Sequence, residues 1–257
     1  MNDRIRINRV ARNSMLALLL LLLVPAPRAM AADWPRQQPD GSQAVLLLAD
    51  FDDHPVGEPI GTGGAESGEP IAVDAQVSAI VEQPVGMNRV LAMDADSLAS
   101  ASGVTFGLLG GVAVEEGQAR FRVALAFPDL VGFNIYLREP TGSAHDFGTL
   151  QLGDDGSIVV FDANGIVGQI GTWSAGQILR LSIEHDLDAG TYDVLLDDVV
   201  LLDDRAHGVA GQSIGRFIMN FQFGQGPTRV LIDNVSVTAT LPDRIFRDGF
   251  DGDVPLR

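Results

Sequence analysis

Apolar and polar residues alternate with a period of two along much of this chain, most clearly between residues 176 and 203. Early in that stretch, residues of two sets alternate. The first set is Leu179, Leu181, Ile183 and His185, which are mostly apolar, and the second is Arg180, Ser182, Glu184 and Asp186, which are polar. This is the pattern of a half-buried strand. Ala189-Gly190 then turns the chain, and two β-rich runs, 191–196 and 199–202, are separated only by Asp197-Asp198, which predicts a tight hairpin. The stretch therefore predicts a meander of three antiparallel strands.

Runs of strand length recur through the rest of the chain at the spacing of an all-β sandwich. The predicted strands outside the meander are 44–51, 76–82, 88–95, 104–110, 119–127, 132–139, 147–153, 157–163, 215–224 and 229–239. No segment has a 3.6-residue apolar period over eleven residues, so we expect very little helix. The pattern predicts an all-β fold, a two-sheet antiparallel jelly-roll sandwich of roughly 12 to 14 strands.

The meander also resembles a motif of the concanavalin A-like, laminin-G-like sandwich family. The matching positions are Trp173, Gly176, Leu181, Ile183, Asp186, Gly190, Tyr192, Val194 and Asp197. The resemblance extends over about residues 45–238. It implies the sandwich fold and a broad class of carbohydrate ligands, while the same fold also occurs in lectins, glycoside hydrolases, lyases and adhesive modules.

The N-terminus has the composition of a secretory signal peptide. A basic segment holding Arg4, Arg6, Arg9 and Arg12 is followed by an apolar segment, 15–24, and by the small-residue site Ala29-Met30-Ala31. Ten apolar residues are about half of a membrane span, so we expect export and cleavage rather than anchoring. The expected organisation is a signal peptide at 1–31, a flexible N-terminus at 32–43, a β-sandwich domain at 44–240 and a C-terminal tail at 241–257.

The chain is strongly acidic, with a formal net charge of −17, and all of its basic side chains are arginines. Such an excess of acid argues against nucleic acid and anionic lipid as partners. It suits an exported protein, periplasmic or extracellular, and offers many oxygen ligands for calcium. The absence of cysteine rules out a disulfide framework, so the sandwich core must hold the fold by itself, or with a structural metal.

Asp233 is the strongest candidate for a metal ligand. In the run 229–239 it shares strand parity with Leu231 and Val235, which predicts that it points toward the core, where an ionised carboxylate needs a partner. The closing strand also resembles the last strand of jelly-roll carbohydrate-binding modules, where an aspartate helps to hold a structural calcium. The resemblance implies Asp50, Asp52 or Asp53 as the N-terminal partner. The alternative is that Asp233 accepts backbone N–H groups at the end of the sheet.

Strand parity also predicts a polar outer face that binds a ligand. Its proposed members are Arg122, Asn134, Tyr136, Arg138, Asn220 and Gln222. Arginine, amide and aromatic side chains together suit sugar hydroxyls and carboxylates. The alternative is that these residues form the ordinary solvated face of an antiparallel sheet.

An enzymatic function has weaker support. The run 184–188 resembles the E-x-D-x-E strand of laminarinase-like glycoside hydrolases, but Asp188 replaces the last glutamate and precedes a predicted turn. The four histidines show no zinc spacing, and no G-x-S-x-G element is present. We therefore expect a protein that is not an enzyme.

Two functions remain open at this point. The first is an exported, lectin-like carbohydrate-binding module acting on extracellular glycan, and the second is a structural or adhesive protein that binds a surface protein. A laminarinase-type hydrolase ranks third. The tail residues 244–253 resemble a short ending found on exported proteins of some Gram-negative bacteria, which implies a bacterial source.

Overall fold

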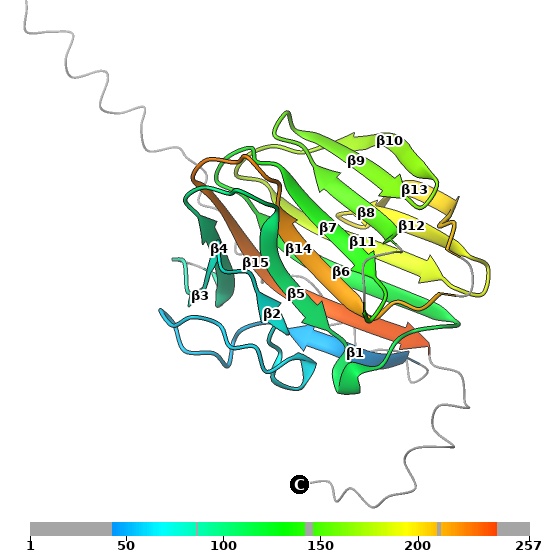
Figure 1. Ribbon diagram of the computed structural model, residues 1–257, viewed down its shortest axis with the longest axis horizontal. Helices are drawn as coiled ribbons and strands as arrows, with labels where there is room; N and C mark the ends of the chain where they lie inside the picture. The colour runs from blue at the N-terminus through cyan, green and yellow to red at the C-terminus, as the bar shows by residue number, and fades with distance from the viewer. Residues whose placement is uncertain (1–42, 86, 142–145, 210–211, 241–257) are drawn as a thin grey trace, which may run out of the picture.

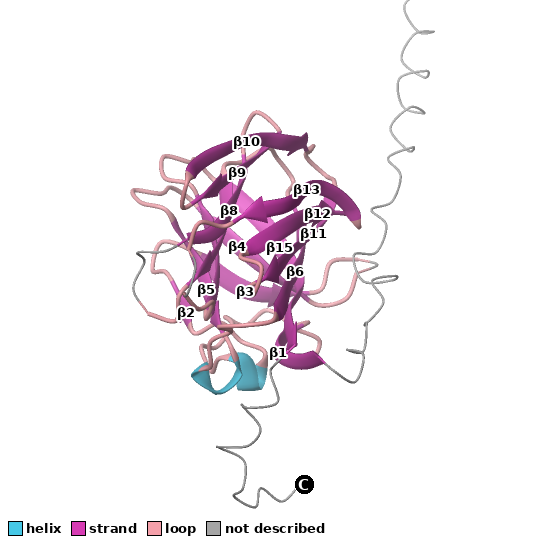
Figure 2. Cartoon of the chain, turned by 90° about the vertical axis from the view of Figure 1, so that its right-hand side faces the viewer, coloured by secondary structure: helices cyan, strands magenta, loops and turns pink. Residues whose placement is uncertain are grey.

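The computed structural model describes residues 43–85, 87–141, 146–209 and 212–240. The predicted signal peptide, nearly all of the expected flexible N-terminus and the tail lie outside these residues. The described chain forms two antiparallel sheets that face each other (Figures 1 and 2). Its helical residues are two single 3-10 turns, Ala65–Ser67 and Leu109–Gly111. The all-β, two-sheet antiparallel prediction is confirmed.

Sheet A has the strand order β13-β12-β11-β6-β15-β4-β3, and β1 also pairs with β15. The bounds of its strands are β1 Gln43–Ala49, β3 Ser78–Glu82, β4 Val90–Ala95, β6 Gln118–Ala126, β11 Ile178–Asp186, β12 Thr191–Leu196, β13 Val199–Ala206 and β15 Thr228–Thr240.

Sheet B has the order β10-β9-β8-β7-β14-β5-β2. The bounds of its strands are β2 Ala72–Val73, β5 Ser102–Gly107, β7 Phe133–Arg138, β8 Asp146–Leu152, β9 Ser157–Asp162, β10 Gly165–Thr172 and β14 Arg216–Phe221.

The predicted meander is β11, β12 and β13, which pair in sequence order at one edge of sheet A. Asp197 and Asp198 connect β12 to β13 with φ angles of 50° and 62°. Two consecutive residues with positive φ define the two-residue turn whose twist matches that of the flanking strands. Aspartate tolerates this conformation better than most residues do, which explains the Asp-Asp pair at a position that usually favours glycine.

The described residues contain 15 strands, slightly more than predicted. The two that the pattern missed are β2, which has only two residues, and β10, which contains Gly165, Gly168 and Gly171 and two register shifts against β9. Glycine packs no side chain onto a neighbouring strand, so such a segment shows little alternation.

The core lies between the sheets and consists of the inward residues of both. In β7 these are Phe133, Ile135 and Leu137, each at most 1% exposed. Trp173 packs on Phe127 at 5.0 Å between ring centroids and donates its indole N–H to the carbonyl of Gly153 (3.1 Å). Alternation along the predicted strand 215–224 places Phe223 on the same side as Phe217 and Phe221 and so predicts that it is buried. This is wrong, because β14 ends at Phe221 and leaves Phe223 73% exposed.

Strand β15 is the longest of the described strands and shows one irregularity. Along one edge it pairs with β6 over residues 231–239. Along the other edge it pairs first with β4, over 228–232, and then with β1, over 235–240. Between these two partners the register against β6 shifts, and Asn234 has a φ of 53°, the signature of a β-bulge.

Within the described residues, no helix is long and apolar enough to cross a membrane.

Replacing Asp198 by glycine tests the turn between β12 and β13. Glycine adopts positive φ without steric cost, so we expect Asp198→Gly to stabilise the protein by about 0.5–1 kcal/mol. The comparison is Val199→Gly at the first position of β13, which pairs with Leu196 and does not have positive φ, so that glycine should destabilise instead. Denaturant unfolding measures both, and a loss of stability in Asp198→Gly would contradict the assigned turn.

Candidate functional site

Strands β7 and β14 lie side by side in the middle of sheet B and bring distant polar residues into register. Asn134 pairs with Asn220, Tyr136 with Ile218, and Arg138 with Arg216. Residues directly opposite each other on neighbouring strands share one face of the sheet. Because the alternate residues of both strands fill the core, these polar side chains lie on the outer face of sheet B. We call them, together with Gln222, the amide–arginine face.

One end of this face is a chain of hydrogen-bonded amides. The Nδ2 of Asn134 donates to the Oδ1 of Asn220, and the Nε2 of Gln222 donates to the Oδ1 of Asn134, both at 3.2 Å. Asn134 is 7% exposed, so the neighbouring amides hold it in place. Beside Asn220, Gly103 of β5 leaves no space for a side chain, since an added Cβ would lie 1.9 Å from the carbonyl oxygen of Met219.

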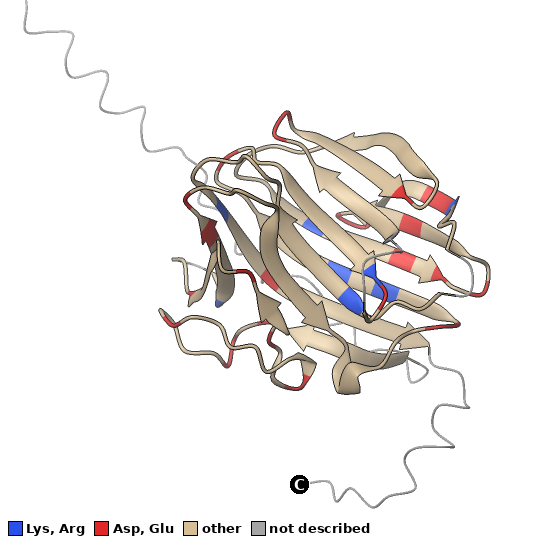
Figure 3. Ribbon diagram, in the orientation of Figure 1, with Lys and Arg blue, Asp and Glu red and all other residues tan. Residues whose placement is uncertain are grey.

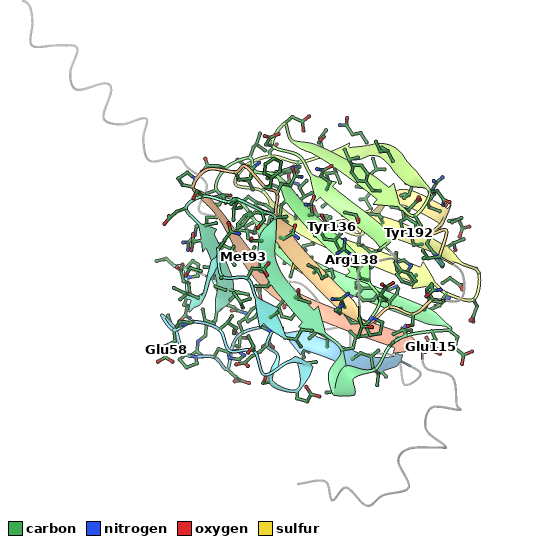
Figure 4. All side chains as sticks on the ribbon, viewed as in Figure 1. Glu58, Met93, Glu115, Tyr136, Arg138 and Tyr192 are labelled. Carbon is green, nitrogen blue, oxygen red and sulfur yellow. The ribbon has the colours of Figure 1, made fainter. Side chains whose placement is uncertain are left out.

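The other end of the face carries two guanidinium groups. The Cζ of Arg138 lies 4.6 Å from the centroid of the Tyr136 ring, which is a cation–π distance (Figure 4). The Nε of Arg216 donates to the carbonyl of Glu139 (2.7 Å), and the amide of Gly215 donates to the carbonyl of Arg138 (2.9 Å). The ring contact orients the side chain of Arg138, the bond to Glu139 orients that of Arg216, and the bond from Gly215 fixes the backbone at Arg138. A forked guanidinium in a fixed position can bind a carboxylate or paired hydroxyls at two points.

Arg122 does not belong to this face. It lies on β6 in sheet A, where it pairs with Ser182 and Ser236. The two sheets have opposite outer faces, so the predicted single surface of six residues is wrong in this member. The parity of Arg122 is as expected, but parity does not reveal which sheet contains the strand.

A cavity of about 240 Å³ opens on the outer face of sheet A instead. Its polar lining includes Gln118, Arg120, Glu184, Asp186, Thr191 and Asp193. Figure 3 shows the surrounding concentration of acidic residues along β11, β12 and β13. The sequence did not reveal this cavity, because its lining residues come from several strands. Which strands are neighbours becomes known only when the order of the sheet is known.

The run 184–188 contributes to that cavity but does not form a carboxylate pair poised for catalysis. Both oxygens of Glu184 accept from Arg120, Oε1 from Nε at 2.8 Å and Oε2 from Nη2 at 2.9 Å. Arg120 therefore occupies both oxygens of this carboxylate in a forked, charge-assisted pair. Asp188 instead accepts the backbone N–H of Gly117 (3.0 Å).

Asp233 occupies the bulge of β15, and the predicted metal ligands Asp50 and Asp52 lie close to it. Burial raises the pKa of Asp233 to about 7, and the charges of Asp52 and Asp50 add to the increase. The backbone N–H and Nδ2 of Asn234 donate to its two oxygens, at 2.7 and 2.9 Å. Because Asp50 directly follows β1 and β1 pairs with β15 as far as Val235, the fold brings the N-terminal aspartates to the bulge.

The direction predicted for Asp233 is wrong, although its burial is as expected. Register pairs it with Ala124, whose neighbours Val123 and Leu125 fill the core, so Asp233 lies on the outer side of sheet A. Leu231 lies on that side as well, and the bulge at Asn234 shifts the parity so that Val235 points inward. Asp233 is nevertheless 1% exposed.

The acidic residues at the bulge do not form a ready-made metal cage. Among the residues that the structure describes, no group of three or more His, Asp or Glu side chains is arranged to hold a metal ion. Arg89 also enters the loop after β1, where its Nη1 donates to the carbonyls of Asp52 and His54. The accumulation of negative charge around a buried carboxyl is what favours a cation here.

Comparison with known proteins supports the fold alone. No family model matches the chain, and no curated protein matches it in sequence. Among solved structures, a sialidase superposes with a TM-score of 0.58 at 12% identity, covering 76% of this chain and 18% of the sialidase. The alginate lyase AlgAT5 of polysaccharide lyase family 7 superposes with a TM-score of 0.53 at 12% identity, covering 78% of this chain and 95% of the lyase.

These likenesses confirm the concanavalin A-like, jelly-roll sandwich. This chain spans less than a fifth of the sialidase, and the identities are far too low to transfer an activity.

The raised pKa of Asp233 predicts a loss of stability with rising pH. Below about pH 4 the carboxyl is neutral in both folded and unfolded chains, whereas between pH 4 and 7 only the unfolded chain ionises. In a chelator, we therefore expect wild-type stability to fall relative to Asp233→Asn between pH 4 and 8, by a few kcal/mol at most at about 1.4 kcal/mol per pKa unit. Urea unfolding of wild type and Asp233→Asn at about pH 4 and about pH 8 measures this difference in the free energy of unfolding.

The matched control for this experiment is Asp155→Asn. Asp155 is exposed, and hydrogen bonds from the side chain and backbone of Ser157 lower its pKa, so the sign of its contribution is opposite. The prediction would be contradicted if the free energy of unfolding changed with pH in the same way in wild type and in Asp233→Asn. Asp233 would then not be a buried carboxyl whose charge lacks a partner.

Proposed function

We propose that this protein is an exported, non-catalytic carbohydrate-binding module whose ligand face is the amide–arginine face. The observation that carries the proposal is the register of β7 and β14, which joins Asn134, Asn220 and Gln222 at one end with Tyr136 and Arg138 at the other. Five of the six residues selected for this chemistry from the sequence share that one surface.

The chemistry of the face suits a sugar chain lying across the strands. Amides present both donors and acceptors to hydroxyl groups, and their mutual hydrogen bonds fix their orientation before a ligand arrives. The Tyr136 ring offers an apolar surface to the carbon side of a pyranose, and Arg138 adds forked donors for hydroxyl or carboxylate oxygens. Polar groups held in place on a rigid sheet lose little entropy on binding.

The non-catalytic part of the proposal follows from the residues on the face. The side chains that define it are amides, arginines and a tyrosine, with no carboxylate pair of the kind that glycoside hydrolysis uses. The carboxylates of the 184–188 run lie on the opposite sheet, where Glu184 is paired with Arg120.

A structural or adhesive function is the second candidate. The acidic cavity on sheet A is the observation that favours it, because Glu184, Asp186 and Asp193 would attract a basic surface of a partner protein. Such an association weakens steeply as salt screens the charges.

A glycan array read with three variants tests the proposed function. We expect Arg138→Ala to weaken glycan binding by about tenfold or more, since a hydrogen bond to a charged group contributes about 1.5–3 kcal/mol. Tyr136→Ala should weaken it by about fivefold, since a ring contact contributes about 1 kcal/mol. Neither side chain is in the core, so the melting temperature should change little. Arg122→Ala removes the same kind of charge from the opposite sheet and should bind like wild type.

Three results would contradict the carbohydrate proposal. The first is equal weakening by Arg122→Ala. The second is loss of stability in parallel with binding in the other two variants. The third is a silent array together with salt-sensitive association with another protein, which would favour the adhesive candidate.

We also propose that Asp50, Asp52 and Asp233, with nearby loop carbonyls, bind a structural calcium ion. The support is the raised pKa of the buried Asp233 carboxyl beside two further aspartates, because a divalent cation would offset the repulsion among them. Calcium bound there would join the loop after β1 to the bulge of β15.

Thermal melts with and without calcium test this site. Calcium at about 100 times its dissociation constant should stabilise wild type by about 2.7 kcal/mol, which amounts to several degrees in the melting temperature. Asp233→Asn should abolish the shift, while Asp155→Asn should keep it. Coincident wild-type melts in calcium and in chelator would contradict calcium binding.

A further inference from the structure

Two buried histidines lie between the sheets and have no role in the amide–arginine face itself. His185 of β11 and His207, directly after β13, are each 2% exposed, with ring centroids 6.0 Å apart. Buried polar atoms in native proteins nearly always have a partner. Within the described residues, neither ring nitrogen of His185 has a hydrogen-bond partner, and neither does the Nε2 of His207.

His185 is surrounded by rings. Tyr192 of β12 stacks on it at 5.4 Å with an interplanar angle of 24°. Phe121 of β6 and Phe147 of β8 each meet it edge-on at 6.1 Å. A charged imidazolium in this position would lose its hydration and gain no acceptor. Burial, with a smaller effect from His207, therefore lowers the pKa of His185 to about 3.

His207 forms one hydrogen bond that depends on its protonation state. Its Nδ1 accepts the backbone N–H of Val209 at 3.1 Å, so the neutral ring carries its proton on Nε2. A second proton would have to bind at Nδ1, which would then no longer accept from Val209. The Nδ1–H of His207 and the backbone N–H of Val209 would be two donors that point at each other. Burial lowers the pKa of His207, while the charge of Asp162 opposes that effect.

The charged groups around the two histidines are already paired with each other. Asp162 of β9 has a fully buried side chain and accepts from the Nε of Arg205 of β13 at 2.9 Å. The hydroxyl of Tyr192 lies 3.5 Å from the same carboxylate oxygen. The side chains that β6 and β8 place against the histidines are phenylalanines. Within the described residues, the carboxylate of this cluster thus already has a cation as its partner before a proton reaches either histidine.

Phe147 connects this cluster to the arginine end of the ligand face. Its ring is fully buried and packs on His207 at 5.6 Å as well as on His185. The preceding residue, Asp146, pairs through its backbone with Arg138, just beyond a register shift in the pairing of β7 with β8. The position of Arg138 therefore depends on a strand end that the histidine cluster holds. Figure 4 labels Tyr192 of the cluster together with Tyr136 and Arg138.

We propose that His185 and His207 form an acid-sensitive latch that holds the Arg138 end of the amide–arginine face at neutral pH and releases it in mild acid. Its effect on ligand binding rests on the proposed carbohydrate function, whereas the opening of the latch does not. The ligand is a glycan bound through Arg138, and the regulating species is the proton.

The first step of release is protonation of His207 at Nδ1, which breaks the bond to Val209 and detaches the segment after β13. Water then reaches His185, which takes up a proton in the opened state. Because both pKa values are lowered in the folded protein, the stability that the neutral rings contribute is present above about pH 6.5 and is lost as the pH falls below it.

Amide hydrogen exchange followed by NMR at pH 7.5 and pH 5.0, without any ligand, tests the latch. After correction for intrinsic exchange rates, we expect the amides of His207 and Val209 to exchange at least about tenfold faster at pH 5.0. A histidine that has an ordinary pKa of about 6.5 in the opened state, and stays neutral in the closed state, shifts the closed–opened equilibrium about thirtyfold toward the opened state between pH 7.5 and pH 5.0.

Two variants and one control assign the effect to these histidines. In His207→Asn the amide oxygen accepts from Val209 but does not titrate, so the acceleration at pH 5.0 should fall to the part that His185 alone contributes by protonating in the opened state. His185→Phe, which keeps an aromatic ring against Tyr192, should reduce it. His54→Asn removes a histidine that lies beside Glu69, outside the cluster, and should leave it unchanged. Equal protection at both pH values in wild type, or full acceleration in His207→Asn, would overturn the latch.

Glycan binding measured at the same two pH values separates this inference from the proposed function. We expect wild-type affinity at pH 5.0 to fall in proportion to the fraction of molecules that remain closed, as the exchange measurements give it, and His207→Asn to lose less affinity than wild type. An absence of glycan binding at pH 7.5 would refute the carbohydrate proposal, while the exchange measurements would still decide the latch. An opened state that predominates at pH 5.0 together with pH-independent binding would refute the connection through Phe147.

Discussion

Sheet A depends on the pairing of one strand, β15. One of its edges is occupied by β6, and the other is divided between β4 and β1, so the two ends of the described chain and the centre of the sheet all meet on it. A straight strand would need one continuous partner. The bulge at Asp233 and Asn234 lies where β4 gives way to β1, and it places a buried carboxyl at the junction. The same strand thus holds the sheet together and buries a carboxyl whose pKa is raised to about 7.

The amide–arginine face arises from the same kind of constraint in sheet B. Antiparallel register between β7 and β14, strands that are far apart in the sequence, is what joins Asn134 to Asn220 and Arg138 to Arg216. The inward residues of both strands are fixed by the core, so the outward residues cannot move relative to one another. A ligand face built on two core strands is rigid because the hydrophobic core beneath it is close-packed.

Alternation along single strands predicted most of the fold and part of the candidate site. It located the meander and the outward direction of five residues of the amide–arginine face, because each of these depends only on strand parity. It failed where a property belongs to the assembled sheet. Arg122 has the expected parity but lies on the other sheet, and Val235 follows a bulge that reverses the parity. The glycine-rich β10 shows no alternation to detect, and the histidine cluster depends on contacts between sheets.

The composition of the ligand face has a consequence for how the protein responds to its surroundings. One end of the amide–arginine face consists of amides, which carry no charge at any ordinary pH. That end of the proposed sugar-binding surface is therefore chemically the same in mild acid and at neutral pH. Any acid dependence in its affinity has to originate in the interior, so a measurement made at the surface reports the protonation of groups that no ligand touches.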